Sequence, residues 1–249
     1  MIKFEVKNIK VDYTLDDRVI QVLDDISFSI NKTQSVVIVG PSGCGKTTLI
    51  RILAGLEKPE KGMVKLNGKK LFGKPNSKIM LVFQSFALLP WKTVLENVEL
   101  ALLHKKEKDR QKIAIRYIDL VGLDGFEGSY PRELSNGMKQ RVGLARALCR
   151  EPNVLLMDEP FSVLDPLSAN NLRNEVLKLA EQKKSSLNVL ITVTHNVEEA
   201  VIMADRVLVM KQRPSRIIAD IPVNLPKPRN RRSEDFNNLV DEITSLITA

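Results

Sequence analysis

Short apolar runs separated by polar turns divide the chain, and their spacing predicts its strands and helices. Runs of four to eight residues rich in β-branched side chains are typical of strands. Apolar residues three and four positions apart are typical of helices that bury one face. The expected strands are 2–13, 19–30, 35–39, 63–66, 79–83 and 154–157, and the expected helices begin near 46, 94, 113, 135, 167 and 236.

The order of these elements predicts an α/β fold with an inserted helical lobe. Strand and helix patterns alternate up to about Gln84 and again after Asn153, which is typical of a parallel sheet covered by helices. Between Ser85 and Arg150 the pattern is helical. We therefore expect one domain over 1–249, with an α/β core at 1–84 and 151–249 and a helical subdomain at 85–150.

A glycine-rich segment, GPSGCGKT, lies between the strand pattern at 35–39 and the following helix pattern. This arrangement predicts a P-loop, because glycines let backbone N–H groups close around phosphates and the helix N-terminus adds partial positive charge. We expect Lys46 to reach the β- and γ-phosphates and the Thr47 hydroxyl to bind Mg²⁺. The expected cradle comprises Gly40, Pro41, Ser42, Gly43, Cys44, Gly45, Lys46, Thr47 and Thr48.

A second buried-strand pattern, VLLM, ends in two adjacent carboxylates, Asp158 and Glu159. A carboxylate at a strand tip beside a P-loop can hold Mg²⁺. The carboxylate after it is a candidate general base for a water in line with the γ-phosphate. Two solvated loop acids would show the same local pattern. The stretch LSNGMKQR, which leads into the helix pattern VGLARAL upstream, favours the chemical interpretation.

Several short motifs in a fixed order make the chain resemble the nucleotide-binding subunit of an ABC transporter over nearly its whole length. LSNGM resembles the family signature, which is usually LSGGQ, and Gln84 at the end of IMLVFQ matches the Q-loop. The run SVLD, ending at Asp165, matches the D-loop, and His195 in TVTHNVEEA matches the switch histidine. Tyr13 is a candidate aromatic for stacking on adenine.

The resemblance implies a P-loop NTPase fold with a RecA-like core, an N-terminal antiparallel β subdomain and an inserted α-helical subdomain. It implies an ATPase that uses ATP and Mg²⁺. The implied metal ligands are Thr47, Gln84 and Asp158, and the implied catalytic residues are Glu159, His195 and Gln84. In this family the signature of one subunit closes on ATP bound to another, so Ser135, Asn136 and Gly137, together with Asp165, are expected to act on a second copy.

The signature departs from the family pattern at two positions. Asn136 stands where the first glycine is expected, and Met138 replaces a glutamine. If position 136 needs a positive φ, asparagine is the least costly replacement, because it tolerates the left-handed region. We therefore expect Asn136 in the left-handed conformation. Ser135 and the Gly137 N–H remain available for the γ-phosphate.

Helix capping explains part of these motifs without any chemistry. Asp165 followed by Pro166 is a suitable N-cap and first-turn proline for the next helix. Asn196 with Glu199 forms a capping pattern that places His195 at a strand-to-helix junction. Such a junction is where a side chain can point at a γ-phosphate. The other histidine, His104, lies in a charged stretch and is expected to be solvated.

Composition narrows the class of protein further. A chain of 249 residues with 43% hydrophobic residues can bury one substantial core. Cys44 and Cys149 are expected in the P-loop and the signature helix, so we expect no structural disulfide and a reducing cytoplasm. The sequence contains no apolar run of about 18 residues and no signal-peptide pattern. We therefore expect a peripheral protein on the cytoplasmic face of the membrane, whose pore belongs to another chain.

The basic composition also permits a nucleic-acid partner. The net charge is +8, with basic residues concentrated at 105–116 and 227–232. Neither cluster is interleaved with aromatic residues, which make up only 5% of the chain. We therefore expect no nucleic-acid partner and interpret the first cluster as a solvated helix face, with some attraction to acidic lipid headgroups.

Three features resemble the importer branch for nitrate, taurine, aliphatic sulfonates and related small solutes. They are ALLPW at 87–91, methionine in the signature and RPSRI at 213–217. The resemblance implies membrane permease subunits, a periplasmic or extracellular solute-binding protein and a second ATPase copy as partners. The chain does not itself identify the solute. We expect the segment from Phe86 to Trp91 to dock the permease; the alternative is that it packs inside the helical lobe.

Other ABC ATPases are the competing classes. DNA-repair and chromosome-maintenance relatives insert long coiled coils between P-loop and signature, whereas no heptad run lies between Lys46 and Ser135. Translation-associated relatives usually join two cassettes, and only one P-loop is present here. An exporter or cell-division subunit is disfavoured only by LLPW and RPSRI.

Overall fold

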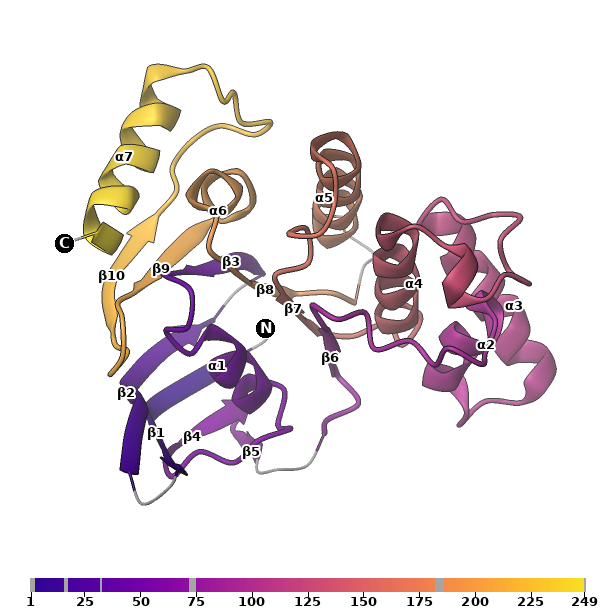
Figure 1. Ribbon diagram of the computed structural model, residues 1–249, viewed down its shortest axis with the longest axis horizontal. Helices are drawn as coiled ribbons and strands as arrows, with labels where there is room; N and C mark the ends of the chain where they lie inside the picture. Colours follow the sequence, from indigo (N-terminus) through magenta and orange to yellow (C-terminus); the bar gives the residue numbers. More distant parts are fainter. Residues whose placement is uncertain (1–2, 16–17, 32, 72–74, 182–185, 249) are drawn as a thin grey trace. The chain divides into compact units, whose positions relative to one another are not determined.

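The protein forms two compact units, seen in the computed structural model of Figure 1. The structure describes residues 3–15, 18–31, 33–71, 75–181 and 186–248. One unit, the P-loop unit, comprises 1–76 and 188–249, and the other, the signature unit, comprises 77–187. The chain therefore leaves the P-loop unit once and returns to it after the signature unit.

An antiparallel sheet opens the P-loop unit, in the strand order β2-β1-β4-β5. The long hairpin of β1 (Phe4–Leu15) and β2 (Arg18–Ile30) pairs through β1 with β4 (Lys61–Leu66), and β4 pairs with β5 (Lys69–Leu71). Asn67 and Gly68 have φ values of 50° and 78°, as a two-residue hairpin turn requires. The expected N-terminal strands are confirmed, and the short β5 is an addition.

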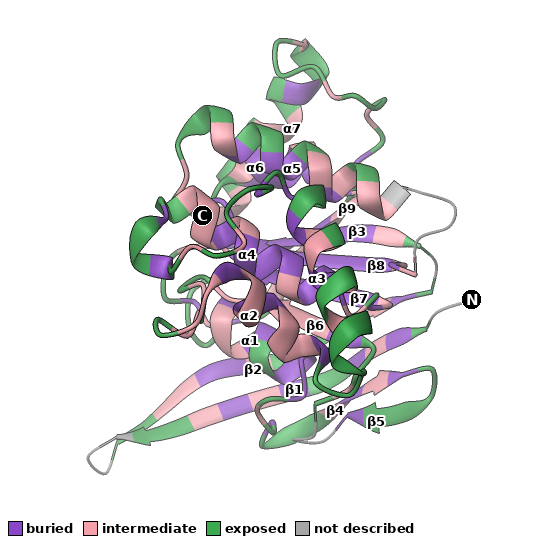
Figure 2. Cartoon of the chain, turned by 90° about the vertical axis from the view of Figure 1, so that its right-hand side faces the viewer, coloured by how far each residue is buried: buried purple, intermediate pink, exposed green. Residues whose placement is uncertain are grey.

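A second sheet of the P-loop unit runs in the order β10-β9-β3-β8. The buried strand β3 (Gln34–Val39) pairs in parallel with β8 (Val189–Thr194) and β9 (Arg206–Met210). The exposed edge strand β10 (Ile217–Pro222) is antiparallel to β9. Figure 2 shows β3 and β8 as largely buried strands. Strands that are covered on both faces are apolar at nearly every position, which explains the continuous apolar runs of β3 and β8.

Three helices complete the P-loop unit. α1 (Lys46–Leu53) packs on β8, and Gly55 follows it with a φ of 74°, as the expected glycine stop requires. α6 (Val197–Met203) lies against β3 and β8. α7 (Glu234–Thr248) packs on α6 and β9 and buries Phe236 and Ile243. The C-terminal helix therefore packs on the core, as its apolar face predicts.

The signature unit combines a parallel strand pair with helices. β6 (Ile79–Val82) pairs with β7 (Val154–Asp158), and α4 (Asn136–Leu148) packs on β6 and on α5 (Pro166–Glu181). α2 (Val94–Glu99), continued by the short helix Leu100–Leu102, packs with α3 (Glu107–Leu120) and α4. A 3-10 turn, Pro131–Glu133, precedes α4. α3 begins six positions before the expected segment, because its exposed first turns are charged helix formers.

Candidate functional site

The P-loop is shaped by glycines that no other residue can replace without movement. Gly43 and Gly45 have φ values of 77° and 106°. A Cβ on Gly45 would lie 2.8 Å from Val22 Cγ1, and a Cβ on Gly40 would lie 2.7 Å from the Met210 carbonyl oxygen. The loop between β3 and α1 therefore keeps its backbone exposed for a ligand, as the sequence predicts.

Lys46 is buried and bonded to its own loop. Its Nζ donates hydrogen bonds to the carbonyl oxygens of Gly40, at 2.8 Å, and Pro41, at 3.0 Å. Thr47 and Thr48 lie in the first turn of α1. The ammonium group is thus held at the loop by weak acceptors that a phosphate group can replace.

Ser215, in the segment RPSRI at 213–217, holds this segment to the P-loop. Ser215 is fully buried, and its hydroxyl donates to the carbonyl oxygens of Cys44 and Lys211. Its backbone N–H donates to Val22 at 3.0 Å, and its carbonyl accepts from Asp24 at 2.9 Å. Residues 211–216 are therefore fixed to the P-loop and β2.

This segment places Arg213 beside the P-loop. Its Nη2 lies 3.4 Å from the position that a Cβ on Gly43 would occupy. In the described part of the chain, the exposed guanidinium forms no ion pair or hydrogen bond. A cation at this place suits the phosphate groups of a nucleotide. No local pattern in the sequence indicates this contact, because it joins segments far apart in the chain.

Tyr13, the candidate adenine-stacking residue, lies beside α1. Its hydroxyl donates to the Glu57 carboxylate, and the side chains of Thr48 and Arg51 are close enough to influence it. Burial, followed by the bond to Glu57, raises the pKa of the Tyr13 hydroxyl. The side chain remains 38% exposed. The structure thus places an accessible aromatic next to the P-loop helix.

His195 lies at the junction between β8 and α6, as expected. Asn196 caps α6 by accepting a 3.0 Å hydrogen bond from the Glu199 N–H. The Glu199 carboxylate accepts from the Thr194 hydroxyl at 3.2 Å, and that hydroxyl accepts from the Asn196 N–H at 3.1 Å. These bonds hold the backbone on both sides of His195, whose side chain is exposed.

In the signature unit, Gln84 and Glu159 come together. Asp158 is the last residue of β7 and is only 5% exposed. Glu159 follows in the left-handed region, with a φ of 44°, and its carbonyl accepts from the Ser162 hydroxyl at 2.9 Å. Gln84 Nε2 donates to Glu159 Oε2 at 3.3 Å. Left-handed residues other than glycine are uncommon and gather at functional sites.

The conformation expected for Asn136 is wrong. Ser135 is the N-cap of α4, and its hydroxyl accepts a 3.2 Å hydrogen bond from the Met138 N–H. Asn136 is therefore the first residue of a right-handed helix, and it is not among the residues with positive φ. Ser135 and Asn136 are exposed at this helix N-terminus, while Gly137 lies near Leu164 of the D-loop match.

Asp165 caps α5, as the alternative interpretation of this motif predicts. Its Oδ1 accepts from the N–H groups of Leu167, at 3.1 Å, and Ser168, at 3.0 Å. The hydrogen bonds from Ser168 lower the pKa of the Asp165 carboxyl. Capping accounts for the residue fully in this structure, so its role toward a nucleotide stays a prediction.

Arg146 of α4 holds the chain that follows Gln84. Its guanidinium donates to the carbonyl oxygens of Phe86, at 2.9 Å, and Ala87, at 2.7 Å. Phe86 and Ala87 are both left-handed, with φ values of 61° and 48°. Burial lowers the pKa of the Arg146 guanidinium. No sequence motif marks Arg146, because it fixes a backbone that lies far away in sequence.

Asn97 arranges the turn that presents Trp91. This fully buried side chain accepts from the Leu89 N–H at 2.8 Å and donates to the carbonyl oxygens of Leu89, Lys92 and Thr93. Thr93 and Glu96 form the expected capping box of α2. Trp91 is 69% exposed. Trp91 therefore does not pack inside the helical lobe, whereas Leu88 and Leu89 are half-buried, so docking by this segment stays a prediction.

The residues expected to bind Mg²⁺ have suitable donors. Thr47 supplies a hydroxyl, Asp158 a buried carboxylate and Gln84 an amide oxygen that the bond to Glu159 leaves unused. Mg²⁺ prefers oxygen ligands and is often held by one carboxylate together with substrate phosphates. Each of these donors is of a kind that fits that ion.

A P-loop, a buried strand-end carboxylate and a capped signature helix occur together in this chain. The family model described as ABC transporter matches residues 23–162, more than half of the sequence. The chain belongs to the ABC transporter family. Its structure resembles the dimeric ATP-binding cassette MJ0796, solved in a post-hydrolysis state with ADP and Pi. The TM-score is 0.80 at 29% identity, covering 89% of this chain and 99% of that one.

Two curated relatives are named as import ATP-binding proteins. The aliphatic sulfonates import ATP-binding protein SsuB of Bacillus cereus is 43% identical over 229 residues, which cover 91% of this chain and 88% of that protein. The nitrate import ATP-binding protein NrtD of Synechocystis sp. is 41% identical over 236 residues, which cover 90% and 87%. The expected P-loop NTPase fold and ATPase activity are confirmed for this ABC ATPase.

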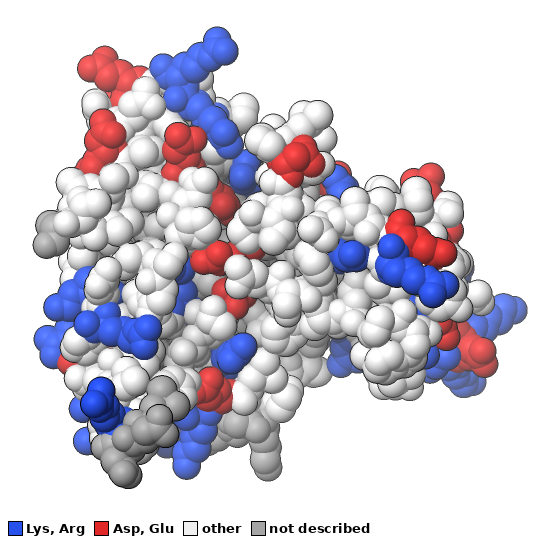
Figure 3. Space-filling view, viewed as in Figure 1, with Lys and Arg blue, Asp and Glu red and all other residues white. Residues whose placement is uncertain are grey.

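Two surface properties bear on its partners. Among the described residues, none of the helices combines the length and apolar character needed to cross a membrane. On the face drawn in Figure 3, Lys and Arg side chains form several separate groups with Asp and Glu between them. On this face the basic charge is thus divided rather than continuous.

Proposed function

We propose that this ABC ATPase powers an importer, as one of a pair of ATPase subunits bound to separate permease subunits on the cytoplasmic face of the membrane. The observation that carries the proposal is the short segment between Gln84 and Trp91. At one end Gln84 contacts the carboxylate of Glu159, and at the other Trp91 is exposed on a fixed turn. Such a segment can relate the state of the nucleotide to a docked membrane partner.

The names of the two relatives support a small anionic solute as cargo. One is described for aliphatic sulfonates and the other for nitrate. We propose nitrate, taurine, an aliphatic sulfonate or a related compound, delivered to the permease by a periplasmic or extracellular solute-binding protein. The solute does not bind the ATPase, so its identity depends on those partners.

The proposed reaction begins with ATP in the P-loop. Backbone N–H groups around Gly43 and Gly45 bind the phosphates, and the Lys46 ammonium exchanges the carbonyl oxygens of Gly40 and Pro41 for phosphate oxygens. Mg²⁺, when bound by Thr47, Asp158 and Gln84, would offset phosphate charge. In this arrangement an activated water attacks the γ-phosphate.

Glu159 is the proposed general base. Its carboxylate accepts a proton from the attacking water, while Gln84, already bonded to it, helps to orient that carboxylate. His195 is proposed to hold the γ-phosphate through its exposed imidazole at the end of β8. Tyr13 is proposed to stack on the adenine from its position beside α1.

The signature is proposed to act on ATP bound to the second copy. α4 begins at an exposed Ser135 and has no acidic residue in its first turn, so its N-terminus can accept a γ-phosphate. Asn136 and Gly137 add backbone N–H groups at this end, and Asp165 is proposed to lie at the same interface. ATP would then hold two copies together, and hydrolysis would release them.

The test is purification of tagged Glu159→Gln protein from membranes with ATP, followed by mass spectrometry of the bound proteins. We expect a permease with several membrane spans and, after mild cross-linking, a solute-binding protein. An exporter or cell-division complex would be recovered without a solute-binding protein. Recovery only from the soluble fraction, bound to nucleic acid, would contradict the proposal and favour a non-transport ABC ATPase.

A further inference from the structure

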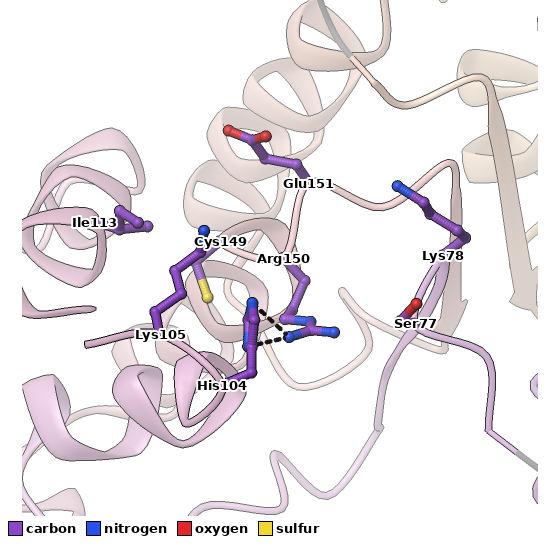
Figure 4. A pocket seen from close by; sticks show the side chains of 8 residues that line it. All are labelled: Ser77, Lys78, His104, Lys105, Ile113, Cys149, Arg150 and Glu151. Carbon is purple, nitrogen blue, oxygen red and sulfur yellow. Dashed lines mark hydrogen bonds between the residues drawn. The ribbon is translucent and has the colours of Figure 1, made fainter. Parts of the chain in front are cut away.

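A pocket of about 210 Å³ opens on the signature unit, and Figure 4 shows the side chains that line it. Three segments and Ile113 of α3 line it, and the segments are 77–78 before β6, 104–105 before α3, and 149–151 after α4. Gln84 and Glu159 follow the carboxyl ends of β6 and β7, whereas the first and last of these segments precede the amino ends of those strands. The pocket and the Gln84–Glu159 pair therefore lie at opposite ends of the same strands.

The side chains around the pocket are mainly basic. Lys78, Lys105 and Arg150 contribute three cations, and Glu151 contributes the one carboxylate among the lining residues. That carboxylate accepts a 3.4 Å hydrogen bond from the Tyr117 hydroxyl, and Figure 4 shows it pointing away from the Arg150 guanidinium. In the described part of the chain, neither Lys105 nor Arg150 forms an ion pair.

Arg150 is held in place without using all its donors. Its Nη1 donates to the Ala101 carbonyl oxygen at 3.1 Å and lies 2.5 Å from His104 Nδ1. In the described residues, Nη2 and Nε of this guanidinium have no hydrogen-bond partner. A guanidinium fixed by neutral acceptors, with donors left over, is prepared for an oxyanion at little entropic cost.

The remaining lining residues add no negative charge. Burial raises the pKa of the Cys149 thiol to about 12, so this residue is neutral at physiological pH. Ile113 supplies an apolar wall, and Ser77 supplies a hydroxyl. The volume is below the roughly 300–1,000 Å³ of pockets for larger ligands, which favours a phosphate-sized group over a nucleotide.

We propose that this pocket binds a small phosphate-type oxyanion through Lys78, Lys105 and Arg150. The ligand is either free phosphate or the phosphate of a lipid headgroup, since the same contacts suit both. Cys149, Arg150 and Glu151 directly follow α4, whose other end is Ser135. The site therefore lies at the far end of the signature helix.

The two histidines allow a direct test by proton NMR, because His104 lines the pocket and His195 does not. The Cε1–H signal of His104 is assigned with His104→Gln. Sodium phosphate is then titrated at matched ionic strength with ADP present to occupy the P-loop. We expect a saturable shift of the His104 signal that sodium chloride does not produce.

The same titration repeated across pH tests the chemistry of the site. Burial, Arg150 and Lys105 lower the pKa of His104. A bound phosphate dianion favours the imidazolium, so the pKa of His104 should rise toward its ordinary value. The other charged residues that line the pocket with this ring are Lys78, Lys105, Arg150 and Glu151. A pKa unaffected by phosphate would overturn the proposal.

A charge-matched pair of variants distinguishes the pocket from general basicity. Lys105→Glu should weaken phosphate binding at least about tenfold, while Lys108→Glu, an exposed residue of α3 outside the pocket, should leave it unchanged. Melting temperatures of both variants establish that they fold. Equal losses in the two variants would show a nonspecific charge effect and refute the site.

Sedimentation with phosphatidylcholine vesicles, with and without phosphatidic acid, identifies the source of the phosphate. Binding that needs phosphatidic acid and is lost only in Lys105→Glu assigns the headgroup. An NMR response without vesicle binding assigns soluble phosphate. If neither assay shows binding that depends on Lys105, the pocket is not an anion site.

Discussion

Gln84 and Glu159 are 75 residues apart in sequence, yet the amide of one donates a 3.3 Å hydrogen bond to the carboxylate of the other. Glu159 is also held at a φ of 44°, a conformation that costs an ordinary L-residue about 1 kcal/mol or more. Its carbonyl is fixed by the N–H and hydroxyl of Ser162. A hydrogen bond therefore joins the candidate base to the start of the Q-loop, and the backbone of the base is strained.

Glu159→Gln should lower ATP turnover by roughly 10²–10⁴-fold, because the amide cannot accept the proton of the attacking water. ATP binding should survive, and the closed dimer should accumulate. Steady-state phosphate release and size-exclusion chromatography with ATP measure the two effects. Glu151→Gln is the matched control, since Glu151 also has a positive φ and lies outside the catalytic residues. Near-normal turnover in Glu159→Gln would exclude it as the base.

Arg146→Ala should destabilise the signature unit and loosen the Q-loop segment. The substitution removes two hydrogen bonds from a charged group to Phe86 and Ala87, each worth about 1.5–3 kcal/mol. We expect lower thermal stability and faster proteolytic cleavage between Gln84 and Trp91. Arg146→Lys keeps the charge but not the bidentate geometry, so it should retain only part of the stability that Arg146→Ala loses.

Ala87→Gly provides the complementary change. Glycine removes the strain of an L-residue at a φ of 48°, so this variant should recover part of the stability lost in Arg146→Ala. Denaturant unfolding of the single and double variants measures the effect. If Arg146→Ala unfolds like the wild type and leaves protease sensitivity unchanged, the hydrogen bonds from Arg146 do not stabilise this segment.

Arg213→Ala should weaken nucleotide binding while leaving the chemical step intact. A cation beside Gly43 contributes about 1 kcal/mol to phosphate binding at a solvated site, which is roughly fivefold in KM for ATP. We expect kcat to stay within about twofold. Lys211→Ala, an exposed cation of the same segment, is the control and should change neither constant.

Ser215→Ala tests how Arg213 is positioned. The hydroxyl of Ser215 ties the segment to the Cys44 carbonyl, so its loss should raise KM in the wild-type background. In the Arg213→Ala background the same substitution should have a smaller effect, because the cation it positions is absent. Purely additive effects would show that Ser215 supports the P-loop without acting through Arg213.

Local signals in the sequence predicted much of this structure. The capping box at Thr93 and Glu96 and the caps at Asp165 and Asn196 are present, because each depends on residues within one helical turn. The buried parallel strands are also where their apolar runs place them. The free, buried cysteines Cys44 and Cys149 agree with the absence of a structural disulfide expected from their positions.

The left-handed positions of the site differ from the prediction. Asn136 was expected to be left-handed from its residue type, but the Ser135 cap starts a right-handed helix there. The left-handed residues beside the site are instead Phe86, Ala87 and Glu159, none of which favours that region by itself. Arg146 holds the backbone of Phe86 and Ala87 from a distant part of the sequence, where no local pattern reveals it, whereas Ser162 holds Glu159 from within the same turn.

Trp91→Ala should weaken assembly with the permease while leaving the isolated ATPase intact. Trp91 is 69% exposed, so its removal should change the free energy of unfolding by less than about 0.5 kcal/mol. A tryptophan at the centre of an interface commonly contributes about 2 kcal/mol or more, which is roughly thirtyfold in affinity. Co-purification with the permease, melting temperature and basal ATP hydrolysis should be measured together.

Two further variants show whether Trp91 acts as a docking residue or only as an exposed apolar one. Leu103→Ala removes an apolar side chain that is 65% exposed in the same unit, and it should leave permease assembly unchanged. Asn97→Ala removes the bonds that hold the turn, so it should reduce both stability and assembly. Normal assembly of Trp91→Ala, or an equal loss in Leu103→Ala, would mean that this turn does not bind the permease through its tryptophan. Loss in Trp91→Ala and Asn97→Ala alone would establish that the turn fixed by Asn97 presents Trp91 to the partner.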